Sequence, residues 1–275
     1  MDRHSSHPGH GLRWDARTSR WWWSSTSAAA LHAFSPRDQT TLTCRLPDGA
    51  GMVAHCKSGN LLIGLPKRLC VASAPRHSEG QSRLRVRALV AVDAAEPRTS
   101  ITDGCTDRRG FLVFGTGNAS SDKRPIGSFY QYSVKYGLRR LALPSVAQAS
   151  SICLSNDGRR LYFADAAIGR ILRCDYDAEL AMVANIATFA ELGNIPKPRG
   201  AVVDAAGCLW SAQPGQLVQY DPDGKAVRRI ALDCGTPAFG GAYLGQLMVA
   251  GPSGLVAIPT PLVAGQPDAL FDDHE

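Results

Sequence analysis

The sequence predicts an all-β protein folded as a six-bladed β-propeller, and two observations carry this prediction. Turn signals recur along the chain, and an apolar or aromatic run follows each of them. Four of these turns contain glycines that lie 51, 48 and 49 residues apart, namely Gly59, Gly110, Gly158 and Gly207. Helical periodicity is nearly absent, and residues 178–192 form the one stretch that resembles a helix. Repeats of about 40–50 residues with several short strands are typical of propeller blades.

Each repeat has an apolar run that indicates a strand. In chain order these runs are residues 21–23, 61–65, 111–115, 161–164, 208–210 and 246–249. A second short strand follows in the same repeat, as at 171–177 and 217–220. Runs of this kind between Gly, Asp and Pro residues form strands and hairpins. A two-sheet sandwich is the alternative, but the repeat favours blades around an axis. We therefore expect one domain over residues 10–275, preceded by a flexible tail of residues 1–9.

The composition of the 275-residue chain excludes several classes of protein. Hydrophobic residues make up 44% and charged residues 20% of it, which excludes a disordered chain, a fibre and a small disulfide-stapled domain. No apolar run approaches the ~18 residues of a membrane-spanning helix, so we expect no membrane partner. Residues 1–7 lack the apolar core of a signal peptide, which predicts a cytoplasmic protein.

The net charge of +6 comes from 30 Lys and Arg residues against 24 Asp and Glu residues. These basic residues are dispersed along the chain. Residues 83–87 alternate arginine with apolar residues, and arginine pairs stand beside turns at 139–140, 159–160 and 228–229. A nucleic-acid interface would concentrate basic residues in one patch, with aromatic residues between them. We therefore expect solvated blade edges and no nucleic-acid partner.

Eight cysteines are spread along the chain, and no two of them have Cys-x-x-Cys spacing. Three of them, Cys153, Cys174 and Cys208, stand in apolar runs, where a free thiol behaves as a small hydrophobic side chain. We expect buried free thiols, with a zinc site or a disulfide framework as the less favoured alternatives.

Short motifs follow one another in a fixed order along the chain. They are residues 11–17 (GLRWDAR), 101–104 (ITDG), 122–130 (DKRPIGSFY), 151–158 (SICLSNDG), 200–210 (GAVVDAAGCLW), 237–241 (PAFGG) and a closing strand at 254–257. From about residue 8 to residue 271, this series resembles the regucalcin/gluconolactonase (senescence marker protein) family. The central segment is most similar to the bacterial sugar-lactonase branch, which includes arabinonolactonases. The resemblance also implies a six-bladed propeller.

The resemblance implies one divalent cation, usually calcium or zinc, in the central cavity. The family's ligands are a Glu in the first blade, an Asn before the Ser-Ile/Gly-x-x-Ser-x-Asp-Gly motif and an Asp before the Gly-x-x-Val-Asp-Ala motif. A further Asn, and an Arg two residues before it, contact the substrate. The cation polarises a lactone carbonyl, and the Asp is the favoured base that activates water.

This sequence departs from the family pattern at each metal-ligand position. His10 stands at the Glu position, Ser150 at the Asn position and Arg199 at the Asp position. A dication ~4 Å from a guanidinium group would be repelled by roughly 8 kcal/mol at an effective dielectric constant of ~20. We therefore expect no metal and no other cofactor, with calcium or zinc only if the family site is retained in another form.

The substrate positions are substituted as well. Thr102 and Ser100 stand where the family has Asn and Arg, and Ala119 follows Asn118 at a position that is often acidic in the family. Asp103 is retained beside its glycine. The candidate ligand contacts are Ser100, Thr102, Asn118 and Ser150.

Two functions fit this altered site, and the sequence leaves open whether the protein is an enzyme. The first is a pseudoenzyme that binds a small anionic or sugar-like ligand, a sugar acid or a lactone, in the central cavity. The alternative is a sugar-lactone hydrolase of carbohydrate metabolism. It would work without metal, with Arg199 as electrophile or anion anchor and His10 or Asp103 as base, or with a rearranged metal site. Asp before Gly is also a common turn residue, which gives Asp103 a structural alternative.

Overall fold

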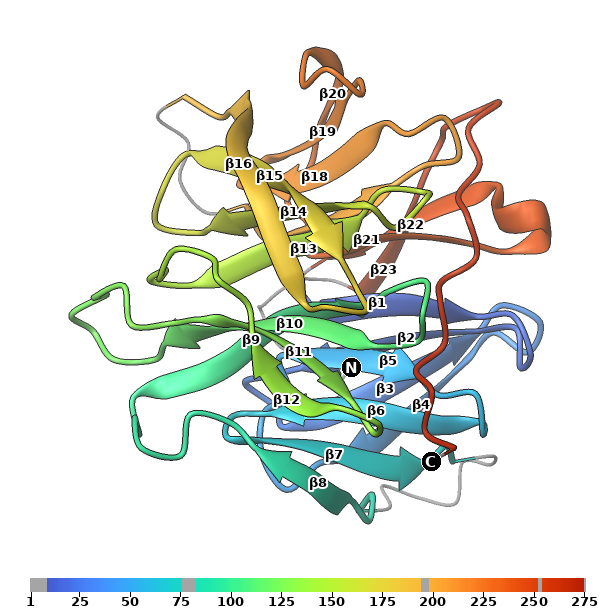
Figure 1. Cartoon of the computed structure of the whole chain (residues 1–275). Helices are drawn as coiled ribbons and strands as arrows, with labels where there is room; N and C mark the ends of the chain where they lie inside the picture. Colours follow the sequence, from blue (N-terminus) through green and yellow to red (C-terminus); the bar gives the residue numbers. More distant parts are fainter. Residues whose placement is uncertain (1–8, 76–82, 194–197, 252–253, 275) are drawn as a thin grey trace.

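The computed structural model describes residues 9–75, 83–193, 198–251 and 254–274. They form six antiparallel sheets around one axis, which confirms the expected all-β, six-bladed propeller (Figure 1). Consecutive strands are neighbours in each sheet, so every blade is a meander that begins at the axis and ends at the outer edge. Residues 1–8 of the expected tail lie outside the described residues, and Gly9 is buried.

The first three blades contain four strands each. Blade 1 contains β1 (His10–Asp15), β2 (Arg20–Ser25), β3 (Ala30–Ser35) and β4 (Thr40–Arg45). Blade 2 contains β5 (Met52–His55), β6 (Asn60–Leu65), β7 (Arg68–Ser73) and β8 (Arg87–Ala91). Blade 3 contains β9 (Thr99–Thr106), β10 (Leu112–Asn118), β11 (Phe129–Ser133) and β12 (Gly137–Arg140).

The last three blades follow the same order. Blade 4 contains β13 (Ala149–Leu154), β14 (Arg160–Asp165), β15 (Arg170–Asp177) and β16 (Met182–Glu191). Blade 5 contains β17 (Gly200–Val203), β18 (Leu209–Gln213), β19 (Gln216–Tyr220) and β20 (Ala226–Ala231). Blade 6 contains β21 (Pro237–Gly240), the 3-10 helix η1 (Ala242–Leu244), β22 (Gln246–Gly251) and β23 (Gly254–Ile258). The stretch that resembles a helix in the sequence therefore forms the outer strand β16 and the turn before it.

The turns that the sequence marks with glycine connect the first and second strands of blades 2 to 5. Gly110 and Gly207 have φ angles of 85° and 84°, a left-handed conformation that favours glycine. Asp107 closes the first of these two turns, because its Oδ1 accepts the backbone N–H groups of Arg109 and Phe111, both at 2.9 Å. Each turn thus depends on its own local residues, which is why the repeat is visible in the sequence.

The hydrophobic core of the described residues is divided into six clusters, one between each pair of neighbouring blades. Trp22 and Leu61 belong to the cluster between blades 1 and 2, while Trp21 packs with Ala238 and Met248 between blades 1 and 6. All eight cysteines are free and six of them are buried, which agrees with the expectation for Cys153 and Cys174, whereas Cys208 is partly exposed. Each blade therefore buries its two faces against its neighbours, and only a closed ring covers all of them.

The C-terminal strap, residues 259–274, crosses the end of the propeller where the inner strands finish. Figure 1 shows it in red, running from blade 6 towards the strands of blade 2. Phe271 in the strap is fully buried, donates its N–H to the carbonyl of His55 at 2.8 Å and accepts the N–H of Lys57 at 2.9 Å. Among the described residues, no helix has the length and apolar character needed to cross a bilayer.

Candidate functional site at the propeller axis

The six inner strands, β1, β5, β9, β13, β17 and β21, form a closed ring, because each contacts the next and β21 contacts β1. All of them run in the same direction along the axis, since every blade has the same meander. Their first residues therefore gather at one end of the propeller. We call this end the axial ring and define it by residues 10–11, 51–52, 100–102, 149–150, 199–200 and 236–237.

Direct contacts place the members of the axial ring at one level. Thr102 Oγ1 donates a hydrogen bond to the carbonyl of Ala149 at 2.7 Å, which joins blade 3 to blade 4. The Gly11 N–H donates to Thr236 Oγ1 at 3.2 Å, which joins blade 1 to blade 6. Blades 2 and 3 approach so closely that a Cβ atom on Gly51 would lie 2.1 Å from a backbone oxygen of blade 3. Neighbouring inner strands therefore pack directly against one another around the ring.

The structure brings the three substituted metal-ligand positions into the axial ring. His10 begins β1, is half-buried, and accepts the Ser24 hydroxyl on its carbonyl at 3.1 Å. Ser150 is 5% exposed, and its buried Oγ has no hydrogen-bond partner among the described residues. A buried polar group without a partner costs about 1–3 kcal/mol. A polar ligand that reaches Ser150 would recover this cost.

A β-bulge positions Ser150. The register between β13 and β14 shifts between Ser150 and Cys153, and Ser151 adopts a φ angle of 57°. The Asp103 carboxylate stabilises the bulge, because its Oδ2 accepts the N–H of Ile152 at 3.0 Å while its Oδ1 accepts the N–H of the residue that follows Asp103 at 2.8 Å. Asp103 therefore links blade 3 to the strand that carries Ser150.

Asp103 and Arg13 form a charged floor below the axial ring. Burial raises the pKa of Asp103 to about 6, although the N–H of Ile152 and the charge of Arg13 act in the opposite direction. Arg13 is 7% exposed and reaches from blade 1 to blade 3, where its Nη2 donates to the carbonyl of Gly104 at 2.8 Å. Its Nε lies 3.9 Å from Asp268 of the strap. The sequence reasoning missed Arg13, for which the available signal was a charge between two apolar residues of an inner strand.

Arg199 is paired with an acidic residue. Its Nη1 lies 2.5 Å from Asp233 Oδ1 and donates to the carbonyl of Cys234 at 3.3 Å. The Arg199 and Asp233 side chains are 31% and 51% exposed, so this ion pair lies where solvent reaches it. The cation expected from the sequence thus stands at the axial ring with its charge compensated by Asp233, a partner that the sequence reasoning missed.

The remaining candidate ligand contacts, Ser100, Thr102 and Asn118, differ in the hydrogen bonds that their side chains already make. Ser100 is partly exposed and pairs with Gly117 across β9 and β10. The Thr102 hydroxyl donates its proton to blade 4, as described above, and keeps its lone pairs. Asn118 is buried, and its amide donates to Asp122 at 2.6 Å, so its side chain stabilises the loop that follows β10.

The donor set of the axial ring does not suit a divalent cation. At the three family ligand positions it offers an imidazole, a hydroxyl and a guanidinium group, whereas calcium takes six to eight oxygen ligands. No three His, Cys, Asp or Glu side chains of the described residues lie close enough together to hold a metal ion. These residues do not fit the cation that the family resemblance implies.

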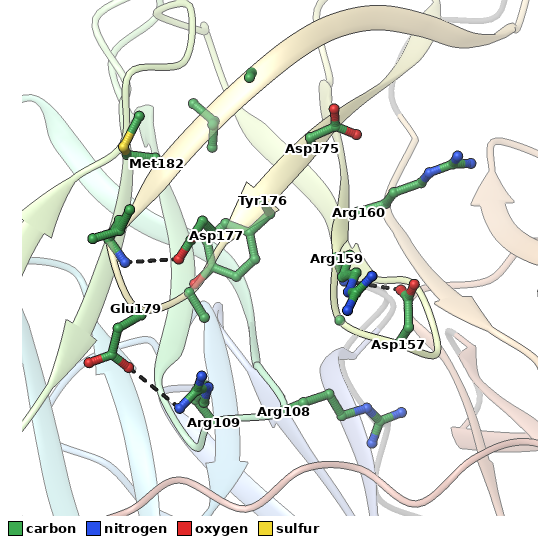
Figure 2. Close-up of a pocket in the computed structure, with 15 residues that line it drawn as sticks. Arg108, Arg109, Asp157, Arg159, Arg160, Asp175, Tyr176, Asp177, Glu179 and Met182 are labelled. Atoms are coloured by element: carbon green, nitrogen blue, oxygen red, sulfur yellow. Dashed lines mark hydrogen bonds and ion pairs between the residues drawn. The ribbon is translucent and has the colours of Figure 1, made fainter.

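A separate cavity of about 860 Å³ lies at the opposite end of the inner strands, between blades 3 and 4. Figure 2 shows Arg109 and Glu179 facing each other on one side, 3.6 Å apart, while the N–H of Arg159 is bound to Asp157 on the other side at 3.0 Å. Four arginines and four acidic residues line this cavity. Because these charges compensate one another, we assign no ligand to it.

Comparisons with known proteins agree with this architecture. Residues 8–251 match the model of the SMP-30/Gluconolactonase/LRE-like region. The chain is 32% identical over 237 residues to an L-arabinolactonase of Azospirillum brasilense, covering 84% of this chain and 75% of that protein. It is 26% identical over 243 residues to a 6-deoxy-6-sulfogluconolactonase of Pseudomonas putida, covering 86% and 80%.

Two solved structures share the fold. A luciferin-regenerating enzyme superimposes with a TM-score of 0.89 at 19% identity, covering 98% of this chain and 96% of the other. A regucalcin of Agrobacterium tumefaciens, described as a calcium-binding protein, superimposes with a TM-score of 0.85 at 23% identity, covering 98% and 95%. At these identities the likeness shows the fold alone.

Proposed function

Because the chain belongs to the SMP-30/gluconolactonase/LRE-like family, we propose that it binds a sugar lactone or sugar acid at the axial ring without a divalent cation. In this proposal the protein is a divergent member of a lactonase family that has lost metal-dependent hydrolysis. The chemistry of the ligand is suggested by the lactonases to which the chain is similar.

The observation that carries the proposal is the buried, unpartnered hydroxyl of Ser150 at the axial ring. Buried polar groups in folded proteins have hydrogen-bond partners with few exceptions, and an exception calls for an explanation such as a ligand. Sugar lactones and sugar acids carry several hydroxyl and carbonyl oxygens within the size of one ring. A ligand of this class would supply the missing partner to Ser150 of blade 4, and His10 of blade 1 stands on the opposite side of the ring.

The charges around the ring support a ligand with acceptor groups. Arg199 keeps donor groups besides the Nη1 that pairs with Asp233, and a guanidinium group suits carboxylate oxygens. Asp103 and Arg13 would act as positioning residues, because they fix the bulge and the floor through the hydrogen bonds described above. The proposal needs no metal, since the donor set at the family ligand positions does not suit one.

Lactone hydrolysis is a second candidate, favoured by the 32% identity to an L-arabinolactonase. Without metal, His10 would take a proton from the water that attacks the lactone carbonyl, the ring C–O bond would break, and the leaving alkoxide would take up a proton. Arg199 would stabilise the negative charge on the carbonyl oxygen. Asp103 suits the role of base less well, because it is buried and both its oxygens accept backbone N–H groups.

Isothermal titration with a panel of aldonolactones and the matching aldonates, in the presence of EDTA, tests the proposed function. The proposal expects binding of at least one of them, with an affinity that EDTA does not change. Binding that appears only after calcium or zinc is added would overturn it, as would the absence of binding across the panel. Release of acid from a lactone in EDTA, lost in Arg199→Ala, would favour the second candidate.

A further inference from the structure

Arg199 carries the one permanent charge among the described residues that define the axial ring. Its backbone N–H donates to the carbonyl of Ala212 at 2.8 Å, which fixes Arg199 beside β18 of blade 5. Its guanidinium group is held from the side of blade 6, because Nη1 contacts Asp233 Oδ1 at 2.5 Å and the carbonyl of Cys234 at 3.3 Å. A ligand at this part of the ring therefore meets an ion pair and not a lone cation.

Asp233 reaches the ring because of the segment to which it belongs. This segment, residues 232–236, connects β20 to β21. A Cβ atom on Gly200 would lie 2.9 Å from Thr236 Oγ1, so the segment and the start of β17 are in direct contact. Cys234 within the segment is fully buried and packs between blades 5 and 6. The fold thus places the Asp233 carboxylate beside Arg199.

The Arg199–Asp233 pair contributes little to the stability of the fold. Its side chains are 31% and 51% exposed, and ion pairs with such exposure add little or nothing measurable to stability. The effect of Asp233 falls instead on a ligand. A ligand group bound to the other N–H groups of Arg199 is separated from the Asp233 carboxylate by one guanidinium group, which is less than the Debye length of about 8 Å at physiological salt.

A sugar lactone and its aldonate differ in charge at the carbon that the two forms share. The lactone presents an uncharged carbonyl oxygen, to which the N–H groups of Arg199 can donate. The aldonate carries a full negative charge at neutral pH, and the Asp233 carboxylate would repel it. Proteins discriminate between two similar ligands by placing an unfavourable charge against one of them.

We infer, on the basis of the proposed function, that Asp233 is a specificity-determining residue of the axial ring, which makes the ring select the uncharged lactone over the matching aldonate. The floor below the ring does not supply a compensating attraction, because the charge of Arg13 acts on Asp103 and Asp268. One like-charge contact at this separation changes affinity by about 10-fold or more.

Isothermal titration in EDTA, at about pH 7.5 where an ordinary imidazole is mostly neutral, tests this inference. The probes are a freshly dissolved aldonolactone, the matching aldonate, and the matching aldonamide, which has the open chain of the aldonate without its charge. For the wild type we expect the lactone and the aldonamide to bind at least ~10-fold more tightly than the aldonate.

Three variants separate the charge of Asp233 from its shape. Asp233→Asn removes the charge, and we expect the affinity for the aldonate relative to the lactone to rise at least ~10-fold. Asp233→Glu keeps the charge and should keep the wild-type ratio. The matched control is Glu96→Gln, because Glu96 forms a partly exposed ion pair of 2.8 Å with Arg98 in the segment that leads to β9. It should also keep the wild-type ratio.

The possible failures of this inference and of the proposed function can be told apart. A wild type that binds the aldonate as tightly as the lactone would overturn the inference and leave the proposed function in place. So would a ratio that Asp233→Asn does not change, or one that Glu96→Gln changes equally, since the overall charge of the molecule would then set it. Absence of binding of all three probes by the wild type would overturn the proposed function and this inference with it.

Discussion

The Ile152 backbone N–H of blade 4 donates a hydrogen bond of 3.0 Å to the Asp103 carboxylate of blade 3. This bond crosses between two blades and fixes the bulge on which Ser150 stands. It gives Asp103 a positioning role below the axial ring. Among the three substituted residues at the ring, Ser150 is therefore the one whose position depends on Asp103.

Asp103→Asn is expected to remove a pH dependence of stability. The pKa of Asp103 is raised from 3.8 to about 6 in the folded protein, so the folded state binds the proton more tightly than the unfolded state. The contribution of Asp103 to the free energy of unfolding therefore falls as the pH rises from about 4 to about 6, by roughly 3 kcal/mol. Urea unfolding at several pH values measures it: the cost of Asp103→Asn relative to wild type should shrink over this window. A cost that stays constant from pH 4 to pH 7 would contradict this role.

The contribution of His55 to the free energy of unfolding is expected to change with pH in the direction opposite to that of Asp103. Burial lowers the pKa of His55 from 6.5 to about 4, so the folded state resists protonation. The stability that neutral His55 contributes is present above pH 6.5 and is lost as the pH falls towards 4, by about 3 kcal/mol. His55→Phe keeps an aromatic ring beside Trp22 and lacks this loss. The wild type should therefore lose more unfolding free energy than the variant between pH 7 and pH 4. Parallel curves of unfolding free energy against pH would contradict the lowered pKa of His55.

Ser150→Ala is expected to separate binding from stability. The Ser150 hydroxyl has no partner in the described structure, so its removal should leave the free energy of unfolding unchanged or raise it by about 1 kcal/mol. Ligand affinity should fall about 5- to 10-fold, as expected for one lost hydrogen bond. The control is Ser133→Ala, because buried Ser133 accepts the N–H of Tyr136 at 3.0 Å. It should lose stability and keep ligand affinity, and an equal stability loss in both variants would argue against an unpartnered Ser150.

Phe271→Ala is expected to loosen the C-terminal strap. Phe271 is fully buried and stacks on Tyr132 with ring centroids 5.8 Å apart, so its truncation should lower the free energy of unfolding by about 3–5 kcal/mol. Lys57→Ala removes the exposed ion pair with Asp272 at the same place and should cost no more than about 1 kcal/mol. Chemical denaturation of both variants measures this difference. Similar losses would mean that Phe271 does not anchor the strap.

The fold could be predicted from the sequence because its signals are local. The turn at Asp107–Gly110 is closed by the residues of the turn itself, and the same pattern returns in four blades. Residues 178–192 were ambiguous because their local signal is weak. Their alternation of apolar and polar residues is poor, and the pairing of β16 with β15 decides their conformation.

The site was predicted less completely, since its chemistry depends on contacts between distant residues. Membership of the axial ring for His10, Ser150 and Arg199 followed from the family motifs. The pairing of Arg199 with Asp233, the reach of Arg13 to Gly104, and the missing partner of Ser150 are properties of the packed ring. No spacing in the sequence encodes them.

We expect the axial ring to work without a divalent cation, and a proton-release assay over a panel of aldonolactones is the decisive measurement. The wild type is measured in EDTA and with added calcium, zinc or manganese. A variant combining His10→Glu, Ser150→Asn and Arg199→Asp restores the family's ligand types and serves as the positive control for cation dependence. We expect that no added cation increases proton release by the wild type. Cation-stimulated hydrolysis by the wild type would contradict it.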